Sequence, residues 1–381
     1  MTYMTDERRM IQESAREFTM REVLPIANKL DPVEGDIPME LREKLAEMGY
    51  FGILIPEEYG GLGLGCFEYC LITEELARGW MSVASIIARG NSLIGMEKMT
   101  EGQRKDMMPK IARGEILGAF AMSEPNTGSD IANISCRAKR DGDSWVITGN
   151  KYWCTFADGA DFIIVIARTS EGNRRHDGLT AFMIPKKRGE LPENVKGSPI
   201  PKIGYFGWKT WELAFDGCRV PNEWMIGEEG KGFYLATHGL EKARAHTAAR
   251  SIGLARGALE DSIAYANERV QFGNPISQFQ AIRFKIATMA TEIEAARQLM
   301  YHVCDAIDTG RRCDLEASMV KLFASEMAER VTSEGIQIHG GAGYTKLHAV
   351  ERYWRDARLT KIFEGTSEIQ QRIISDRILG R

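Results

Sequence analysis

The stretch FQAIRFKIATMATEIEAARQLMYHVCDAIDTG, residues 279–310, decides the fold of this 381-residue chain. Its apolar residues recur at helical spacing, and neither Pro nor Gly interrupts it before its last position. DLEASMVKLFASEMAERVTSEGIQIHG (314–340) and ALEDSIAYANERV (258–270) show the same pattern on either side. Long helices joined by short loops predict a helical bundle in the C-terminal part of the chain.

Two other parts precede this bundle. Residues 5–112 are mostly helical in pattern, whereas short β-rich runs such as SWVITGNKYW (144–153) lie between residues 118 and 229, separated by Gly, Asp, Asn and Pro. We therefore predict an α+β fold that is mostly α. Its predicted parts are an N-terminal helical domain (1–117), a middle antiparallel β domain (118–229) and a C-terminal helical bundle (230–381).

Composition excludes several classes of function. The chain is 44% apolar, its net charge is −4 and its pI is about 6.0, so there is no electrostatic case for nucleic-acid binding. No run of 18 apolar residues exists, so we expect no membrane span. Seven scattered cysteines, the lack of paired CxxC or HExxH motifs and a charged N-terminus predict a cytoplasmic protein without a leader or a metal site.

Three stretches contain residue types that suit a cofactor. AMSEPNTGSD (121–130) ends a β-run in a turn rich in hydroxyl groups, which can bind the polar edge of a ring or a pyrophosphate; the alternative is an ordinary β-turn. KYWCTF (151–156) puts an indole and a hydroxyl on one face of a strand; the alternative is a core Trp with a surface Thr. ANERVQFG (266–273) places an Arg and a Phe near each other, as a phosphate clamp or as surface residues.

One carboxylate stands out near the end of the chain. In KIFEGTSEIQ (361–370), Glu364 lies between an aromatic residue and a glycine, directly before a polar helix start. A solvated loop carboxylate needs no such neighbours. The pattern is typical of a general base at the edge of an apolar site.

Together, these stretches resemble the acyl-CoA dehydrogenase family over nearly the whole chain. The resemblance rests on AMSEPNTGSD, GNKYWCTFA, FDGCRVP, YANERVQFG, QIHGGAGY, RYWRDAR and IFEGTSEIQ, which occur in the family's order. It implies a C-terminal four-helix bundle, a homotetramer, bound FAD, an acyl-CoA substrate and an electron-transferring flavoprotein as oxidant. The expected reaction is α,β-dehydrogenation to the trans-2-enoyl-CoA.

The resemblance also gives roles to residues. Glu364 matches the base of the short- and medium-chain branches, which takes the α-proton while the β-hydride goes to flavin N5. We expect an apolar surrounding to raise its pKa. Gly365 would let the acyl chain approach closely. In other branches the base comes from the position of Ala243, which cannot serve. Arg244 matches a residue that binds coenzyme A.

The expected FAD contacts form a larger set. Ser123 would face the flavin's pyrimidine edge and Ser129 the pyrophosphate, with Trp153 and Thr155 at the ring. The residues expected to reach the same or a neighbouring subunit's cofactor are Arg269, Phe272, Gln280, Gln337, Gly341, Thr366 and Glu368. The family often has Gln where Glu368 stands, and the segment GYFGWKTWEL (204–213), with Trp208, also departs from its pattern.

Arg89 suggests the substrate class. It lies in the small, apolar stretch SVASIIARGNSLIG (82–95), which resembles the wall of the acyl site in this family. An unpaired buried guanidinium is costly, so Arg89 predicts a carboxylate on the substrate, as in glutaryl- or benzylsuccinyl-CoA, with His246 adding polarity. The alternative is that Arg89 turns outward or pairs with Glu97.

Other functions remain open at this point. An acyl-CoA oxidase would pass electrons to oxygen, and a fatty acyl-CoA dehydrogenase of short or medium chain length would need no substrate carboxylate. A flavin monooxygenase of the same fold would not need Glu364. A helical scaffold without flavin would need neither Glu364 nor the flavin loops.

Overall fold

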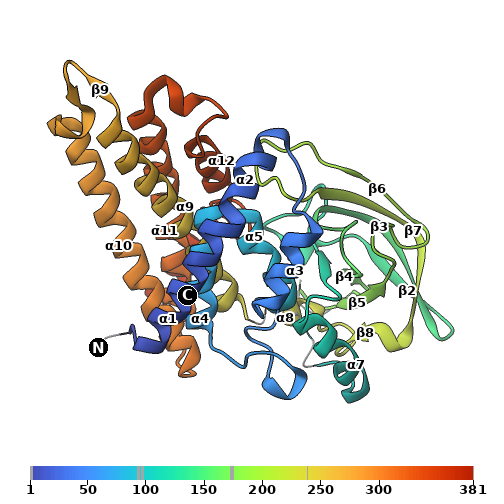
Figure 1. Ribbon diagram of the computed structural model, residues 1–381. Coiled ribbons are helices and arrows are strands. Elements are labelled where there is room, and N and C mark those ends of the chain that lie inside the picture. The colour runs from blue at the N-terminus through green and yellow to red at the C-terminus, as the bar shows by residue number, and fades with distance from the viewer. Residues whose placement is uncertain (1–2, 92–94, 96–97, 172–175, 238, 381) are drawn as a thin grey trace.

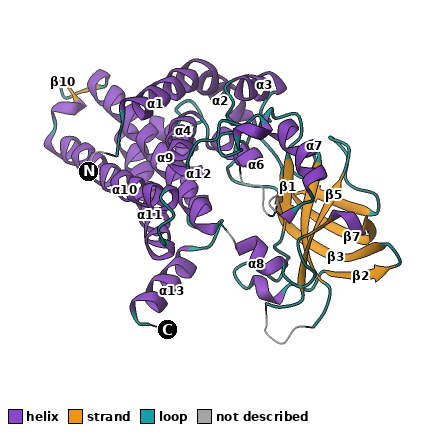
Figure 2. Ribbon diagram, turned by 90° about the horizontal axis from the view of Figure 1, so that it is seen from below, coloured by secondary structure: helices purple, strands orange, loops and turns teal. Residues whose placement is uncertain are grey.

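The computed structural model describes residues 3–91, 95, 98–171, 176–237 and 239–380. Helices and a β-sheet domain lie side by side, with the long C-terminal helices at one end and the sheet at the other (Figures 1 and 2). No helix among the described residues is long and apolar enough to cross a membrane.

The N-terminal helices surround the junction between these parts. They are α1 (Asp6–Phe18), α2 (Leu24–Leu30), α3 (Met39–Glu47), α4 (Cys66–Gly79), α5 (Met81–Ile86), α6 (Ala88–Asn91) and α7 (Glu101–Ala112). Within α4 every residue except Glu68 is buried, which is possible because it packs between other helices rather than at the surface.

The middle domain is one twisted sheet. Its strands are β1 (Gly118–Ala121), β2 (Arg137–Asp141), β3 (Ser144–Thr155), β4 (Phe162–Arg168), β5 (Leu179–Pro185), β6 (Val195–Pro199), β7 (Thr210–Pro221) and β8 (Met225–Ile226). They run in the order β6-β7-β3-β2-β4-β5-β8, and β1 joins at β4. Most pairs are antiparallel as predicted, but β1 and β2 each pair parallel with β4.

The C-terminal part contains α8 (Gly232–Thr237), α9 (Leu240–Glu268), α10 (Gln280–Asp308), α11 (Asp314–His339), α12 (Val350–Thr360) and α13 (Ser367–Ile378). A small hairpin of β9 (Val270–Gln271) and β10 (Asn274–Pro275) joins α9 to α10. Helix α9 packs on α4, α10, α11 and α12, so it lies at the centre of the bundle. The predicted fold class is therefore confirmed.

Candidate functional site

Glu364 lies in the loop between α12 and α13 in a strained conformation. Its φ is 53° and that of Gly365 is 94°, both in the left-handed region that favours glycine. A Cβ added at Gly365 would lie 2.6 Å from Gln370 Nε2, so no other residue fits without movement. Lys321 Nζ of α11 and Gln370 Nε2 donate to the Gly365 carbonyl at 2.6 and 3.1 Å and hold the loop in place.

Both oxygens of the Glu364 carboxylate already accept hydrogen bonds from α9. Arg250 Nη2 donates to Oε1 and Thr247 Oγ1 to Oε2, each at 2.6 Å. Burial opposes ionisation, but the Arg250 charge and these hydrogen bonds outweigh it and hold the pKa of Glu364 below its usual value. The expected rise in this pKa is therefore wrong, because a cation and not an apolar wall faces the carboxylate. The side chain keeps 34% of its exposure, so it remains accessible to a ligand.

Arg250 is the most buried charged partner of this site, with a side chain only 2% exposed. Its Nη1 donates to Ser85 Oγ of α5 at 3.0 Å, and its guanidinium lies 4.5 Å from the centre of the Phe363 ring. Its Nε is buried and has no hydrogen-bond partner among the described residues. The Glu364 charge helps to raise the pKa of Arg250 against the effect of burial, so both groups are ionised.

A second guanidinium lies nearby. Arg89 of α6 is half-buried and sits 5.2 Å from the centre of the Trp208 ring, an arrangement typical of a cation–π contact. Arg89 Nε and Trp208 Nε1 are both buried donors without a partner in the described chain. The side chain thus turns inward, and the alternative partner Glu97 lies outside the described residues. The contact also accounts for Trp208, the unusual residue of its segment.

Tyr205 connects the two guanidiniums. Burial raises the pKa of its phenol, which Arg250 and Arg89 lower in part, so both cations act on one hydroxyl group. Its ring meets Trp208 and Phe363 edge-on, with centroids 5.2 and 6.0 Å away.

Three clamps fix the loop that carries Tyr205 and Trp208. Lys202 Nζ donates to both of their carbonyl oxygens, at 2.8 and 2.9 Å. Asp356 accepts the Tyr205 N–H at 2.6 Å, and Ser82 Oγ donates to the carbonyl of Phe206. The aromatic side of the site is therefore as firmly held as the base.

His246 is close to these charges but is itself neutral. It is buried, stacks on Tyr69 at 4.7 Å, and its Nε2 lies 3.1 Å from the Ala84 carbonyl. Burial and the Arg250 charge lower its pKa to about 3. Two residues earlier, Arg244 is buried, and its Nε has no hydrogen-bond partner among the described residues. Their proposed contacts with substrate remain predictions.

We call Arg89, Arg250, Glu364, Tyr205 and Trp208 the ion cluster. It gathers residues from α6, α9 and two loops. Sequence reasoning predicted Arg89 and Glu364 but missed Arg250 and Thr247. A signal did exist, since residues 243, 246, 247 and 250 share one face of a helix that is otherwise rich in small residues, which indicates a buried polar face.

The loop after β1 is built around a buried ion pair. Glu124 accepts from Lys151 Nζ at 2.9 Å and from the backbone N–H groups of Ser135 and Cys136, both at 2.8 Å. Lys151 also donates to the Met122 carbonyl at 2.9 Å. Burial opposes ionisation of Glu124, but Lys151 and Ser135 hold its pKa below the usual value. Ser123 and the exposed Ser129 are thus presented by a rigid support.

The adjacent part of β3 fits a planar cofactor. Trp153 has a φ of 63° at a bulge between β3 and β7, and its indole is 55% exposed although it lies within a sheet. Thr155 Oγ1 lies 3.1 Å from Thr210 Oγ1. The bulge interrupts the alternation of side chains between the two faces of β3, so the spacing of Trp153 and Thr155 does not by itself place them on one face. An exposed indole in a strained conformation near a pair of hydrogen-bonded hydroxyl groups suits the flavin ring of FAD.

Three of the other predicted cofactor residues lie far from this sheet. Arg269, Phe272 and Gln280 are exposed at or after the β9–β10 hairpin, at the opposite end of the molecule from β3 in both views (Figures 1 and 2). Gln337 and Gly341 are exposed at the end of α11, and Thr366 caps α13 by accepting the Ile369 N–H.

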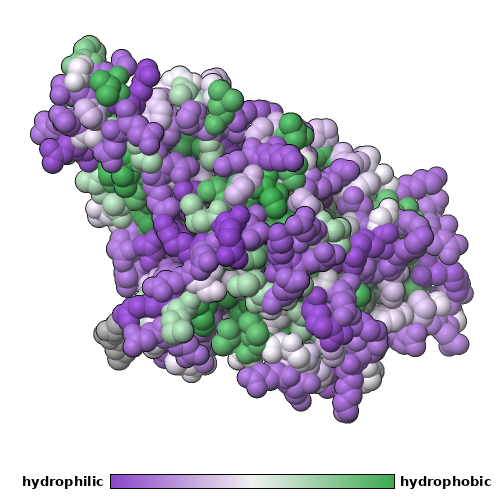
Figure 3. Space-filling view, viewed as in Figure 1, coloured by the Kyte–Doolittle hydropathy of each residue, from purple (hydrophilic) through white to green (hydrophobic). Residues whose placement is uncertain are grey.

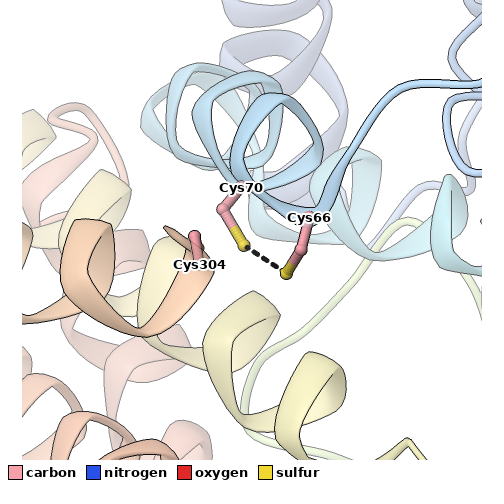
Figure 4. Close-up of side chains that lie close together, drawn as sticks. All are labelled: Cys66, Cys70 and Cys304. Atoms are coloured by element: carbon pink, nitrogen blue, oxygen red, sulfur yellow. Dashed lines mark hydrogen bonds between the residues drawn. The ribbon is translucent and has the colours of Figure 1, made fainter. Parts of the chain in front are cut away.

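A separate cluster contains three buried thiols. The sulfur atoms of Cys66, Cys70 and Cys304 lie within 4.8 Å of one another, with 4.0 Å between Cys66 and Cys70 (Figure 4). Burial raises the pKa of Cys70 and Cys304, whereas contacts with those two thiols lower the pKa of Cys66. Asp308 of α10 accepts the backbone N–H groups of Cys66 and Phe67. We interpret this cluster as core packing.

Comparisons with known proteins show which family the chain matches. Residues 5–115, 119–218 and 230–379 match the N-terminal, middle and C-terminal domains of acyl-CoA dehydrogenase. A (2S)-methylsuccinyl-CoA dehydrogenase of Cereibacter sphaeroides is 41% identical over 98% of this chain and 70% of its own. Subunit CarC of the caffeyl-CoA reductase–Etf complex of Acetobacterium woodii is 39% identical over 99% of each. A glutaryl-coenzyme A dehydrogenase in complex with glutaryl-CoA is 34% identical, with a TM-score of 0.92, over 99% of this chain and 96% of its own.

The Glu124–Lys151 pair gives a prediction about the cofactor loop. Lys151→Met leaves a buried carboxylate unpaired, so we expect a loss of about 3–5 kcal/mol in the free energy of unfolding, together with weaker FAD retention. Urea unfolding and the ratio of flavin to protein absorbance measure both. Glu124→Gln with Lys151→Met should recover much of the stability. Lys139→Met, on the exposed face of β2, is the control, and equal losses in the two lysine variants would contradict the argument.

Proposed function

The chain belongs to the acyl-CoA dehydrogenase family, and we propose that it oxidises the α,β bond of an acyl-CoA thioester whose acyl group carries a second carboxylate. The family's members are flavoprotein oxidoreductases that use FAD and act on acyl-CoA thioesters. The observation that carries the finer proposal is the ion cluster, in which Arg250 pairs with Glu364 while Arg89 has no carboxylate partner among the described residues.

Glu364 is the proposed base for the α-proton. Its carboxylate is ionised, accessible and held by two hydrogen bonds from α9, while Lys321 and Gln370 hold the carbonyl of the next residue, Gly365. FAD, when bound, accepts the β-hydride. The residues that would hold FAD are Ser123, Ser129, Trp153 and Thr155. The two serines belong to the rigid loop after β1, and Trp153 presents an exposed indole. In the reverse direction, which the name of the caffeyl-CoA reductase relative describes for that protein, Glu364 would return the proton to the α-carbon.

Arg89 is the proposed binding residue for the substrate's free carboxylate. Its guanidinium is turned inward, supported by Trp208 and without an ion pair among the described residues. A planar guanidinium can bind both oxygens of a carboxylate at once. Two relatives whose names or titles contain methylsuccinyl-CoA and glutaryl-CoA support this substrate class.

We also propose a homotetramer that reduces an electron-transferring flavoprotein. The two groups of predicted cofactor residues lie at opposite ends of one chain, so one FAD cannot contact both unless a neighbouring subunit supplies the second group. Large apolar side chains are exposed around the hairpin and after α11, where hydrophobic atoms come to the surface (Figure 3): Val270, Phe272, Phe284, Tyr344 and Leu347. The division into domains at 1–117, 118–229 and 230–381 remains part of this proposal.

The role of Glu364 is tested by Glu364→Gln. The amide cannot take a proton, so anaerobic flavin reduction by acyl-CoA should slow by about 10³-fold or more, while FAD and substrate still bind. Stopped-flow spectroscopy gives the rate and a thioester titration gives the binding. A variant that keeps more than about a tenth of the activity would rule out Glu364 as the base.

The substrate class is tested by a panel of thioesters. Methylsuccinyl-, benzylsuccinyl- or glutaryl-CoA should give a higher kcat/KM than butyryl-CoA, and Arg89→Met should raise KM for the preferred thioester by about 30-fold or more. Arg219→Met, which removes an arginine from an exposed ion pair with Asp141, is the matched control. A wild-type enzyme that prefers butyryl-CoA would instead be a fatty acyl-CoA dehydrogenase.

The shared cofactor site is tested by Arg269→Ala. We expect weaker FAD retention together with partial dissociation, because this exposed arginine would contact the cofactor of a neighbouring subunit. Sedimentation velocity and flavin content, compared with Arg219→Ala, measure both effects. A monomer that retains a full complement of FAD would contradict the proposal.

A further inference from the structure

The ion cluster carries more positive than negative charge. Arg89 and Arg250 contribute two cations, Glu364 contributes one anion, and His246 is neutral because its pKa is about 3. Lys321 adds a further cation near the base loop, but its Nζ is occupied by the Gly365 carbonyl. A buried charge without a partner is costly, so this surplus favours an anionic ligand.

The unsatisfied polar groups of the ion cluster also favour an anionic ligand. Arg89 Nε, Arg250 Nε and Trp208 Nε1 are all buried, and none has a hydrogen-bond partner in the described chain. Each of the three can only donate. Glu364 does not accept from any of them, because its donors are Arg250 Nη2 and Thr247 Oγ1. The missing partner is therefore an acceptor.

We propose that the substrate's second carboxylate competes with Glu364 for Arg250, so that only a carboxylate-bearing acyl group frees the base for the α-proton. In the ligand-free enzyme, Arg250 holds Glu364 in a stable but weakly basic ion pair. When a substrate carboxylate binds Arg250, the Glu364 oxygen loses its strongest donor and becomes a better acceptor for a proton. This inference rests on the proposed substrate class and adds a specificity-determining residue to it.

The position of Arg250 also limits where the substrate carboxylate is attached. Arg250 touches the group that must reach the α-hydrogen, so it lies close to the reacting carbons. A carboxylate on the β-carbon, as in succinyl thioesters, is one bond from the reacting pair and can reach the same guanidinium. A glutaryl carboxylate is one carbon farther away and matches Arg89 better. We therefore assign succinyl-type thioesters to Arg250.

The competition predicts an effect on rate rather than on binding alone. A neutral thioester leaves Glu364 paired with Arg250, so it binds but reduces the flavin slowly. Removing the Arg250 charge should raise the pKa of Glu364, because the attraction that lowers it is lost. Loss of the Arg250 charge also raises the pKa of His246, Tyr205 and Lys321, because that charge lowers all three. Of these, Lys321, with a pKa of about 8, titrates within the tested pH range, so its titration is separated from that of Glu364 by the position of the acid limb. A base that must be ionised then shows an acid limb of its pH–rate profile at higher pH.

The test compares methylsuccinyl-CoA with 2-methylbutyryl-CoA, in which a methyl group replaces the carboxylate. Anaerobic stopped-flow flavin reduction is measured from pH 5.5 to 9 in wild type, Arg250→Met and the control Arg219→Met. In wild type, the limiting rate should favour methylsuccinyl-CoA. Arg250→Met should slow this substrate by about 100-fold or more, speed up the neutral one at high pH and move its acid limb to higher pH.

The outcomes separate this inference from the proposed substrate class. If wild type prefers neutral thioesters, the substrate class itself is wrong. If wild type prefers methylsuccinyl-CoA and Arg250→Met keeps that preference, the class stands, Arg89 alone reads the carboxylate and the competition is refuted. Equal slowing of both substrates, without a shift of the acid limb, would show that Arg250 only supports the structure.

A measurement on the wild-type enzyme covers the case in which Arg250→Met fails to fold. Propionyl-CoA and formate together supply the two parts of a succinyl group, and propionyl-CoA leaves the place of the carboxylate free. Formate should therefore accelerate flavin reduction by propionyl-CoA, whereas chloride at the same ionic strength should not. No acceleration by formate at any concentration would overturn the inference.

Discussion

The close contact between α4 and α9 is the constraint on which the site depends. A Cβ at Gly253 would lie 2.3 Å from the Glu74 carbonyl oxygen, so only glycine lets the two backbones approach this closely. Arg256, less than one turn farther along α9, pairs with Glu75 at 2.5 Å and with Glu74 at 3.3 Å. Buried ion pairs of this kind are costly to break, so α9 cannot slide or rotate on α4. Arg250 is thereby held against α5 and the base loop.

The base loop combines an unfavourable backbone conformation with firm hydrogen-bonded support. Glu364 has a left-handed backbone, which is unfavourable for a residue with a side chain, and it persists because Lys321 and Gln370 hold the next carbonyl. The ion pair with Arg250 makes the carboxylate well ordered but less basic. Order and reactivity are therefore in conflict in the ligand-free site, and a substrate that takes Arg250 for itself would remove the conflict.

The sequence predicted the features that follow from local periodicity and missed the contacts between residues that are distant in sequence. Helical and strand periodicity predicted the three-part architecture, and the pattern around Glu364 is the basis of the proposal that it is the base. Nothing local could show that Arg89 lies on Trp208, since 119 positions separate them, or that β1 runs parallel to β4. The sign of the Glu364 pKa shift was wrong for the same reason. Its apolar neighbours are visible in the sequence, but the guanidinium opposite comes from a helix more than a hundred residues earlier.

The surplus positive charge of the ion cluster would let one site attract a carboxylate and reject an apolar acyl tail. Contacts with Phe363 and Trp208 stabilise the two guanidiniums by about 0.5–2 kcal/mol each, which is less than the several kcal/mol lost when a cation leaves water. An apolar acyl tail placed against them would remove water without replacing its hydrogen bonds. A carboxylate would restore those bonds and neutralise the charge. Specificity then comes from the penalty on the wrong ligand as much as from the attraction for the right one. The same two arginines would serve both purposes without any movement of the fold.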